Sequence, residues 1–363
     1  HPSRSGSFRF RYGRGRVSGL SATSLHPSTM AITDGFIATG TQLKIEKPTK
    51  GTVVTACDTI DGPIVKLKSG SVRKIKDFLE ARKIYNDVKE IIYLGDILFP
   101  FSDLSNRNSN LIKSGYVEEW WKLELLEKNP ELEKNTDAFN INFEDAIKIS
   151  SEQGIPLHPS FIFYWTEISK EQFFGLIEWL SHGRTNKKIV LPYTAVDKEK
   201  FEKGKRALEL LGIEHDVVIE NVVINEKNSK ALLCNLGIDW NILEQENYLL
   251  ENEMLKIKEN ADRLLILENL KDNKSKDSEI ILPIINKLSS PLIIKNKAGE
   301  FIGARMGRPE KAKLRKLTGS PNVLFPVGKE GGRLRSVQAA CGVGDVTNTF
   351  PIYHCEKCNK DSI

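Results

Sequence analysis

The chain of 363 residues has little cysteine and no long apolar run. Its five cysteines are few and odd in number, which argues against a disulfide framework and favours an intracellular, reducing compartment. No apolar stretch approaches the roughly 20 residues that span a bilayer, so no membrane partner is predicted. The first sixteen residues lack the apolar segment of a secretory signal peptide. Because the chain starts at His1 and ends five residues past Cys358, we expect an internal fragment cut at both ends.

Acidic residues are scarce in two blocks of the sequence. Residues 1–16 carry five arginines and no acid, and residues 300–335 carry nine basic residues against three glutamates. Such concentrated positive charge attracts phosphate backbones, and we predict that the fold brings both blocks onto one basic surface. The basic residues are Arg4, Arg9, Arg11, Arg14 and Arg16 in the first block, and Arg305, Arg308, Lys311, Lys313, Arg315, Lys316, Lys329, Arg333 and Arg335 in the second.

The first block has the alternation of a strand. Phe8, Phe10 and Tyr12 alternate with Arg9 and Arg11, which predicts aromatic rings on one face and guanidinium groups on the other. One interpretation is an exposed sheet edge protected by charge. The other is phosphate binding by the guanidinium forks, which the absence of acids favours.

Residues 31–75 contain short β-prone runs separated by Gly, Pro and Asp, and they predict a β-rich region. Its lysines are interpreted as solvated surface, with nucleic-acid contact as the alternative. Residues 143–288 indicate an α/β module. The predicted helices are 75–96, 143–153, one opened by the capping box at 169–172, 197–212, 241–270 and 280–288, and the predicted strands are 188–191 and 215–224.

The Trp120–Trp121 pair favours core packing, with stacking on bases as the alternative. Three lone histidines lie near helix ends or before prolines, and none has a partner at metal-ligand spacing. We interpret His158, His182 and His215 as structural or capping residues.

The second basic block predicts a strand, a hairpin and a helix in succession. Residues 291–296 are a β run, and residues 301–302 begin a return strand that leads into small residues around Arg305. Pro309 suits the first turn of a helix, in which Lys313 and Lys316 share one face. Such a helix neutralises a triphosphate or a nucleic-acid backbone, the alternative being a plain surface helix. Residues 328–336 form a glycine-rich loop that is not a P-loop.

Cys355 and Cys358 form a CxxC pair after an aromatic β run, which is typical of the first half of a zinc ribbon. A redox role is the weaker alternative. No carboxylate cluster suits metal-ion catalysis, so any metal-binding acids of a phosphoryl-transfer reaction are expected elsewhere.

Several runs together resemble one known family. They are GARMGRPEKAKLRKLTGSPNVLFPVGKEGGRLRSVQAA, YHCEKC, HPSRSGSFRFRYGRGR, GTQLKIEKPTKG, DGPIV, SGYVEEWW and GIPLHP, and they occur in order along nearly the whole chain. In these runs the chain is similar to the large subunits of the archaeal family D DNA polymerases, also called polymerase II.

The resemblance implies an α+β fold with a double-psi β-barrel, as in multisubunit RNA polymerases. Residues 1–75 and 289–350 would build this first barrel, residues 76–288 a mostly helical α/β insertion, and residues 351–363 a truncated zinc-binding module. It implies a replicative DNA-directed DNA polymerase whose catalytic Mg²⁺ is held by an Asp motif downstream of this chain. The isolated chain is therefore expected to be inactive.

The resemblance also implies partners and site residues. The partners are primer–template DNA, dNTPs, a small exonuclease subunit in a heterodimer, and a sliding clamp bound through other regions, in the archaeal cytoplasm at the nucleoid. The alternatives are a non-catalytic nucleic-acid-binding zinc-ribbon module and an exodeoxyribonuclease activity of the same complex. The site residues are Lys313 and Lys316 in support of catalysis, Arg305, Arg308, Lys311, Arg315, Arg333, Arg335, Arg9, Arg11, Arg14 and Arg16 for phosphate, and Cys355 and Cys358 for Zn²⁺.

Overall fold

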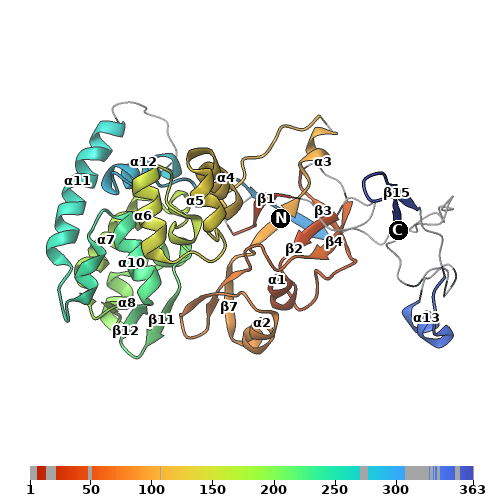
Figure 1. Cartoon of the computed structure of the whole chain (residues 1–363). Helices are drawn as coiled ribbons and strands as arrows, with labels where there is room; N and C mark the ends of the chain where they lie inside the picture. Colours follow the sequence, from red (N-terminus) through yellow and green to blue (C-terminus); the bar gives the residue numbers. More distant parts are fainter. Residues whose placement is uncertain are drawn as a thin grey trace. The chain divides into compact units, whose positions relative to one another are not determined.

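The structure is a computed structural model. The chain divides into two compact units, His1–Gly307 and Arg308–Ile363, and each is described by itself (Figure 1). The structure describes residues 6–13, 22–47, 51–106, 108–269, 277–306, 327, 330, 332, 336–347 and 352–362.

Seven strands of the first unit form a sheet that curls almost into a barrel. They are β1 (Phe8–Tyr12), β2 (Ala22–Leu25), β3 (Gln42–Ile45), β4 (Gly51–Ala56), β8 (Asp96–Phe99), β13 (Phe301–Ile302) and β14 (Ala304–Met306). Their order across the sheet is β13-β1-β8-β2-β4-β3-β14. β13 and β14 stand at opposite ends of this order, yet only Gly303 separates them in the sequence. The sheet must therefore bend until its two ends nearly meet.

β1 is an internal strand of this sheet. It pairs in parallel with β8 and antiparallel with β13, in the registers Arg9↔Asp96 and Phe8↔Ile302. Phe8 and Phe10 are buried in the core of the barrel-like sheet. The predicted alternation of aromatic and guanidinium side chains is confirmed, whereas the interpretation as an exposed edge is wrong because both sides of β1 are paired.

A second sheet is antiparallel throughout and combines strands from two distant regions. They are β5 (Ile64–Leu67), β6 (Val72–Lys74), β7 (Val88–Tyr93), β9 (Arg184–Thr185), β10 (Ile189–Pro192), β11 (His215–Val218) and β12 (Asn221–Ile224). Their order is β7-β5-β6-β11-β12-β10-β9, with β6 and β11 joined at Val72↔His215. Strands from residues 64–93 and 184–224 thus share one sheet, while β8 joins the barrel-like sheet.

Helices supply most of the remaining core of the first unit. They are α1 (Pro27–Ile32), α2 (Phe78–Ile84), α3 (Phe101–Ser105), α4 (Glu118–Lys128), α5 (Pro130–Asn135), α6 (Phe143–Gln153), α7 (Lys170–Ser181), α8 (Ala195–Lys200), α9 (Glu202–Leu210), α10 (Glu226–Asn235), α11 (Glu251–Asn269) and α12 (Asp277–Leu288), with short 3₁₀ helices η1 (Tyr85–Asp87), η2 (Pro159–Phe161), η3 (Trp165–Glu167) and η4 (Trp240–Glu244). Trp121, Trp165 and Trp179 are fully buried among them. In Figure 1, α6, α7, α10, α11 and α12 gather on one side of this unit and β1–β4 on the other.

Helix boundaries follow local capping chemistry. Asn142 accepts the N–H of Asp145 at the start of α6, and Gly154 ends that helix in the left-handed conformation. Ser169 and Gln172 form the predicted capping box of α7. The predicted helices at 143–153 and 280–288 are confirmed by α6 and α12. The predicted core role of the tryptophan pair holds for Trp121, while Trp120 is 41% exposed.

The helix predicted over 241–270 is borne out only from Glu251, as α11, and two other predicted elements are wrong. The helix predicted over 75–96 ends at Ile84, because the β-branched residues that follow pair as β7 with β5. The strand predicted over 291–296 does not form, since the backbone there bonds elsewhere. The Ile293 carbonyl accepts the N–H of Leu157, and the Ile294 N–H donates to Asn286.

In the second unit, the described residues contain α13 (Val337–Val343) and a two-stranded sheet of β15 (Tyr353–Cys355) and β16 (Lys360–Ser362). Across the described parts of both units, no helix has the length and apolar character needed to cross a bilayer.

Candidate functional site

The guanidinium groups of β1 point into a buried ion network. Arg9 and Arg11 are 2% and 3% exposed, and both contact Asp96, the fully buried first residue of β8. Arg9 Nε lies 2.5 Å from Asp96 Oδ1, and Arg9 Nη2 and Arg11 Nη1 lie 2.8 and 3.0 Å from Asp96 Oδ2. Arg11 also pairs with Glu118 and Glu119 at the start of α4.

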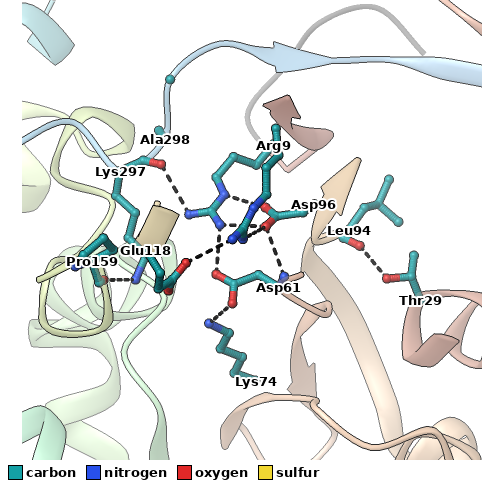
Figure 2. Close-up of polar contacts among 12 residues, drawn as sticks. Arg9, Thr29, Asp61, Lys74, Leu94, Asp96, Glu118, Pro159, Lys297 and Ala298 are labelled. Atoms are coloured by element: carbon teal, nitrogen blue, oxygen red, sulfur yellow. Dashed lines mark hydrogen bonds and ion pairs between the residues drawn. The ribbon is translucent and has the colours of Figure 1, made fainter. Parts of the chain in front are cut away.

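The network continues from Asp96 toward the second sheet (Figure 2). The backbone N–H of Asp61 donates to Asp96 Oδ2 at 3.0 Å, and the Asp61 carboxylate pairs with Arg9 Nη2 at 3.0 Å. The other Asp61 oxygen lies 2.6 Å from Nζ of Lys74, at the end of β6. One chain of ion pairs therefore connects the barrel-like sheet, the 61–63 loop and the second sheet.

The charges in this network hold one another ionised. Burial lowers the pKa of Arg9, but Asp96, Tyr164 and Asp61 outweigh it and the net pKa is raised. Burial raises the pKa of the Asp61 carboxyl, but Lys74 and Arg9 hold that pKa well below its usual value. Removing one partner would therefore leave an uncompensated buried charge.

Arg9 and Arg11 were predicted to bind phosphate, and the structure places them differently. Their forks are occupied by Asp96, Asp61 and Glu118, and neither side chain is presented to solvent. We therefore assign them to the buried network and leave them out of any phosphate-binding surface.

An exposed basic edge lies at the other end of the barrel-like sheet. β14 pairs antiparallel with β3 in the register Arg305↔Lys44, so the two cations stand directly opposite one another. Arg305 is exposed and Lys44 half-buried. The neighbouring Glu46 accepts the N–H of Gly303 at 3.1 Å. Like charges opposite each other destabilise a strand pair, so this pair favours an anion bound beside it.

The two strands of the second unit bring Cys355 and Cys358 to one turn. The Asn359 N–H donates to the Cys355 carbonyl at 2.8 Å, which closes the turn. The pKa of the exposed Cys355 thiol is lowered because the backbone N–H and side chain of Cys358 and the N–H of Lys357 hydrogen-bond to its sulfur. His354 bonds instead to Asp361 and Asn359, at 2.7 and 3.1 Å.

The two thiols suit half of a tetrahedral zinc site. Within the described residues, no group of three His, Cys, Asp or Glu side chains could hold a metal ion. The remaining predicted site residues lie outside the described residues: Arg14, Arg16, Arg308, Lys311, Lys313, Arg315, Lys316, Arg333 and Arg335.

Comparison with known proteins agrees with the resemblance seen in the sequence. The family model described as "DNA polymerase II large subunit DP2, central domain" matches residues 1–363. The chain belongs to this family. DNA polymerase II large subunits from Nanoarchaeum equitans, Pyrococcus horikoshii and Methanothermobacter thermautotrophicus are 38%, 35% and 33% identical to it. These alignments cover 100%, 98% and 100% of this chain but only 30%, 26% and 30% of the relatives.

Sequence reasoning missed the carboxylates of this central-domain chain. The sequence shows no carboxylate cluster that would single out Asp61, and Asp96 falls within the helix predicted over 75–96. One signal was available, because a pair of buried-strand arginines without local acids requires carboxylates from another segment. Asp96 follows Gly95, which adopts a positive φ, and precedes the apolar run Ile97–Phe99 of β8.

Proposed function

We propose that this chain is the central part of the catalytic large subunit of a replicative DNA-directed DNA polymerase. The family match over residues 1–363 and the printed names of the relatives support this function. The reaction would be attack of a primer 3′-hydroxyl on the α-phosphate of a dNTP, with pyrophosphate as the leaving group. In this proposal the chain contributes the basic half of the active site, and it acts in the cytoplasm at the nucleoid.

The Lys44–Arg305 pair is the observation that carries the proposal. It marks an exposed face of the barrel-like sheet where two cations stand opposite each other. The chain continues from this pair directly into the segment containing Lys313 and Lys316. A primer–template phosphate bound at this edge would relieve the repulsion between the two cations.

Each basic residue has a distinct part in the proposed site. Lys313 and Lys316 would offset the charge that develops on the dNTP phosphates. Arg305 and Lys44 would contact the DNA backbone, which fixes the position of the duplex without reading its sequence. The further phosphate contacts of the proposal are Arg308, Lys311, Arg315, Arg333, Arg335, Arg14 and Arg16.

The proposed metals differ in their fit to this chain. A catalytic Mg²⁺ does not fit the described residues, in which no metal-binding group of three is present, and we assign its ligands to other parts of the large subunit. Zn²⁺ fits the turn in part. Cys355 and Cys358 would supply two of the four zinc ligands. The bound ion would hold the turn between β15 and β16 in one conformation.

We further propose that the barrel-like sheet is a double-psi β-barrel interrupted by an α/β insertion. The pairing of β1 with β13, in which Phe8 lies opposite Ile302, supports a barrel made from both ends of the first unit. Strands β5–β7 share one sheet with β9–β12 through the pairing of β6 with β11, which suggests that the boundary with the insertion is not a single cut near residue 75. The partners would be DNA, dNTPs, a small exonuclease subunit and, through other regions, a sliding clamp.

Primer extension by the complete large subunit with its small subunit tests the function. The Lys313→Ala/Lys316→Ala variant should lower the rate at saturating dNTP by at least about tenfold, because each lost charge-stabilising donor typically costs more than that. The matched control is Lys128→Ala/Lys258→Ala, which removes two exposed lysines from α4 and α11. Equal extension rates and equal DNA affinity in the two variants would refute the assignment of Lys313 and Lys316.

The sheet edge is tested separately. Lys44→Ala/Arg305→Ala should weaken DNA binding and reduce the salt dependence of the affinity by about one unit of slope per lost phosphate contact. An unchanged salt slope would place the DNA elsewhere. A non-catalytic nucleic-acid-binding module is the second candidate function, and it predicts this loss of affinity with no template-directed extension by the complete complex.

A further inference from the structure

A small pocket outside the proposed polymerase site contains several lysines among its lining residues. It has a volume of about 130 Å³ and lies between the end of β6, η2, the start of α10 and the loop before β13. Four lysines line it, and Glu214 is the one carboxylate among the lining residues that the structure describes. The lysines of this lysine pocket are Lys74, Lys76, Lys227 and Lys297.

The nearby carboxylates do not neutralise the lysine pocket. Glu214 accepts the backbone N–H of Lys74 at 3.0 Å, and Asp61 pairs with the Lys74 ammonium at 2.6 Å from outside the pocket lining. With Lys297 protonated and both carboxylates counted, the four lysines leave a formal excess of two positive charges. The pocket therefore carries more positive charge than its own ion pairs balance.

Lys297 forms the buried end of the lysine pocket. Lys297 is 9% exposed, and its Nζ donates to the Pro159 carbonyl at 2.8 Å (Figure 2). It also donates to the Ile162 carbonyl at 2.9 Å. An ammonium has three N–H donors, and the hydrogen bonds given by the described residues use two of them. The third is available to a ligand in the pocket.

Lys76 and Lys227 are the exposed residues of the rim. The pKa of Lys227 is lowered by partial burial and by Lys76 and Lys74, against the opposing effect of Glu214 and Glu118. These lysines therefore repel one another across the opening. An anion between them would remove the repulsion and accept hydrogen bonds from more than one ammonium.

We propose that the lysine pocket binds a phosphate group. Its volume is below the range of about 300–1,000 Å³ typical of sites for drug-sized ligands, so it suits a single small oxyanion better than a whole nucleotide. The group is either free, as phosphate or pyrophosphate, or terminal, as the 5′-phosphate of a DNA strand that enters from the rim. This inference does not depend on the proposed polymerase function.

Binding should be coupled to protonation of Lys297. Burial lowers the pKa of the Lys297 ammonium, and the positive charges of Lys74 and Arg9 lower it further. The carboxylates of Asp61 and Glu118 raise it, and the net pKa is about 7. A bound phosphate favours the protonated amine. The affinity should therefore fall as the pH rises from 7 to 9, apart from any change in the charge of the ligand itself.

Calorimetric titration of the 363-residue chain tests the proposal with four probes: inorganic phosphate, pyrophosphate, and one oligonucleotide with and without a 5′-phosphate. We expect saturable binding of at least one phosphate probe with a dissociation constant near about 1 mM or below. Lys76→Ala/Lys227→Ala should weaken it by at least about tenfold, since each loses a charge-assisted hydrogen bond. The matched control, Lys68→Ala/Lys89→Ala, removes two exposed lysines outside the pocket lining.

The outcomes separate the possible ligands. Binding of phosphate or pyrophosphate that the rim variant alone weakens identifies a free oxyanion site. A preference for the 5′-phosphorylated over the unphosphorylated oligonucleotide, lost in the rim variant, identifies a DNA end. Equal weakening by the rim and control variants, or no saturable binding of any probe, would overturn the proposal. Binding of the oligonucleotides alone, with equal affinity with and without the 5′-phosphate, would overturn it as well.

Discussion

Replacing Asp96 by Asn should destabilise the barrel-like sheet more than any comparable surface change. Asp96 accepts hydrogen bonds from Arg9 Nε and Nη2, Arg11 Nη1 and the N–H of Asp61, at 2.5–3.0 Å, and it is completely buried. The amide of Asn keeps one acceptor oxygen, removes the negative charge and points an N–H group toward a guanidinium. Loss of one partner from a buried ion pair typically costs about 3–5 kcal/mol.

Hydrogen exchange is the suitable assay because it reports local stability in a protein with more than one unit. In Asp96→Asn, amides of β1 and β8 should lose about 3–5 kcal/mol of protection, while α7 and α9 change less. The matched control is Asp216→Asn, which breaks the half-exposed Arg73–Asp216 pair and should cost about 1 kcal/mol or less. If Asp96→Asn changes the protection of β1 by no more than this control, the network does not stabilise the sheet as we argue.

Three further predictions use the same structure. The pKa of Lys297 is about 7 in the folded chain and near 10.5 in the unfolded chain. Between these pH values the unfolded state binds more protons than the folded state. The free energy of unfolding should therefore rise from pH 7 to 9, by up to about 1.4 kcal/mol per pH unit. When the unfolding free energy is measured by urea at each pH, it should rise less steeply with pH in Lys297→Met than in the unchanged chain. An equally steep rise in the variant would exclude Lys297 as the source of this pH dependence. In the same assay, Trp121→Ala should lower the free energy of unfolding by about 3–5 kcal/mol because Trp121 is buried. Trp120 is 41% exposed, so Trp120→Ala should cost clearly less. Similar losses in the two variants would contradict the assigned burial. In the complete large subunit, Cys355→Ser/Cys358→Ser should lower the bound zinc measured by elemental analysis, and unchanged zinc would exclude this turn as a ligand source.

Local chemistry made part of the fold predictable. The start of α7 follows from Ser169 and Gln172, whose side chains satisfy backbone N–H groups within one turn. The end of α6 follows from Gly154, which adopts the left-handed conformation that other residues avoid. In both cases the residues that decide the structure are within four positions of the boundary.

Predictions failed where the deciding partner was remote. Residues 88–93 fit the apolar spacing of a helix, but β7 forms because it pairs with β5, more than twenty positions earlier. For the site, the charge count of residues 1–16 favoured phosphate binding because it included no acid. Asp96 lies 87 positions from Arg9, and only the parallel pairing of β1 with β8 brings it into contact. Sequence windows contain no information on such a register.

The two groups of basic residues on the barrel-like sheet differ in what surrounds them, and this difference assigns their roles. Arg9 is buried and contacts Asp96 and Asp61, so its guanidinium is already held by two carboxylates. β1 pairs directly with β13, so that arrangement also sets the position of the strand that leads to Arg305. Arg305 faces solvent opposite Lys44, another cation. The arginines of β1 are therefore assigned to holding the sheet together, and phosphate contact is proposed only for the cations of the edge.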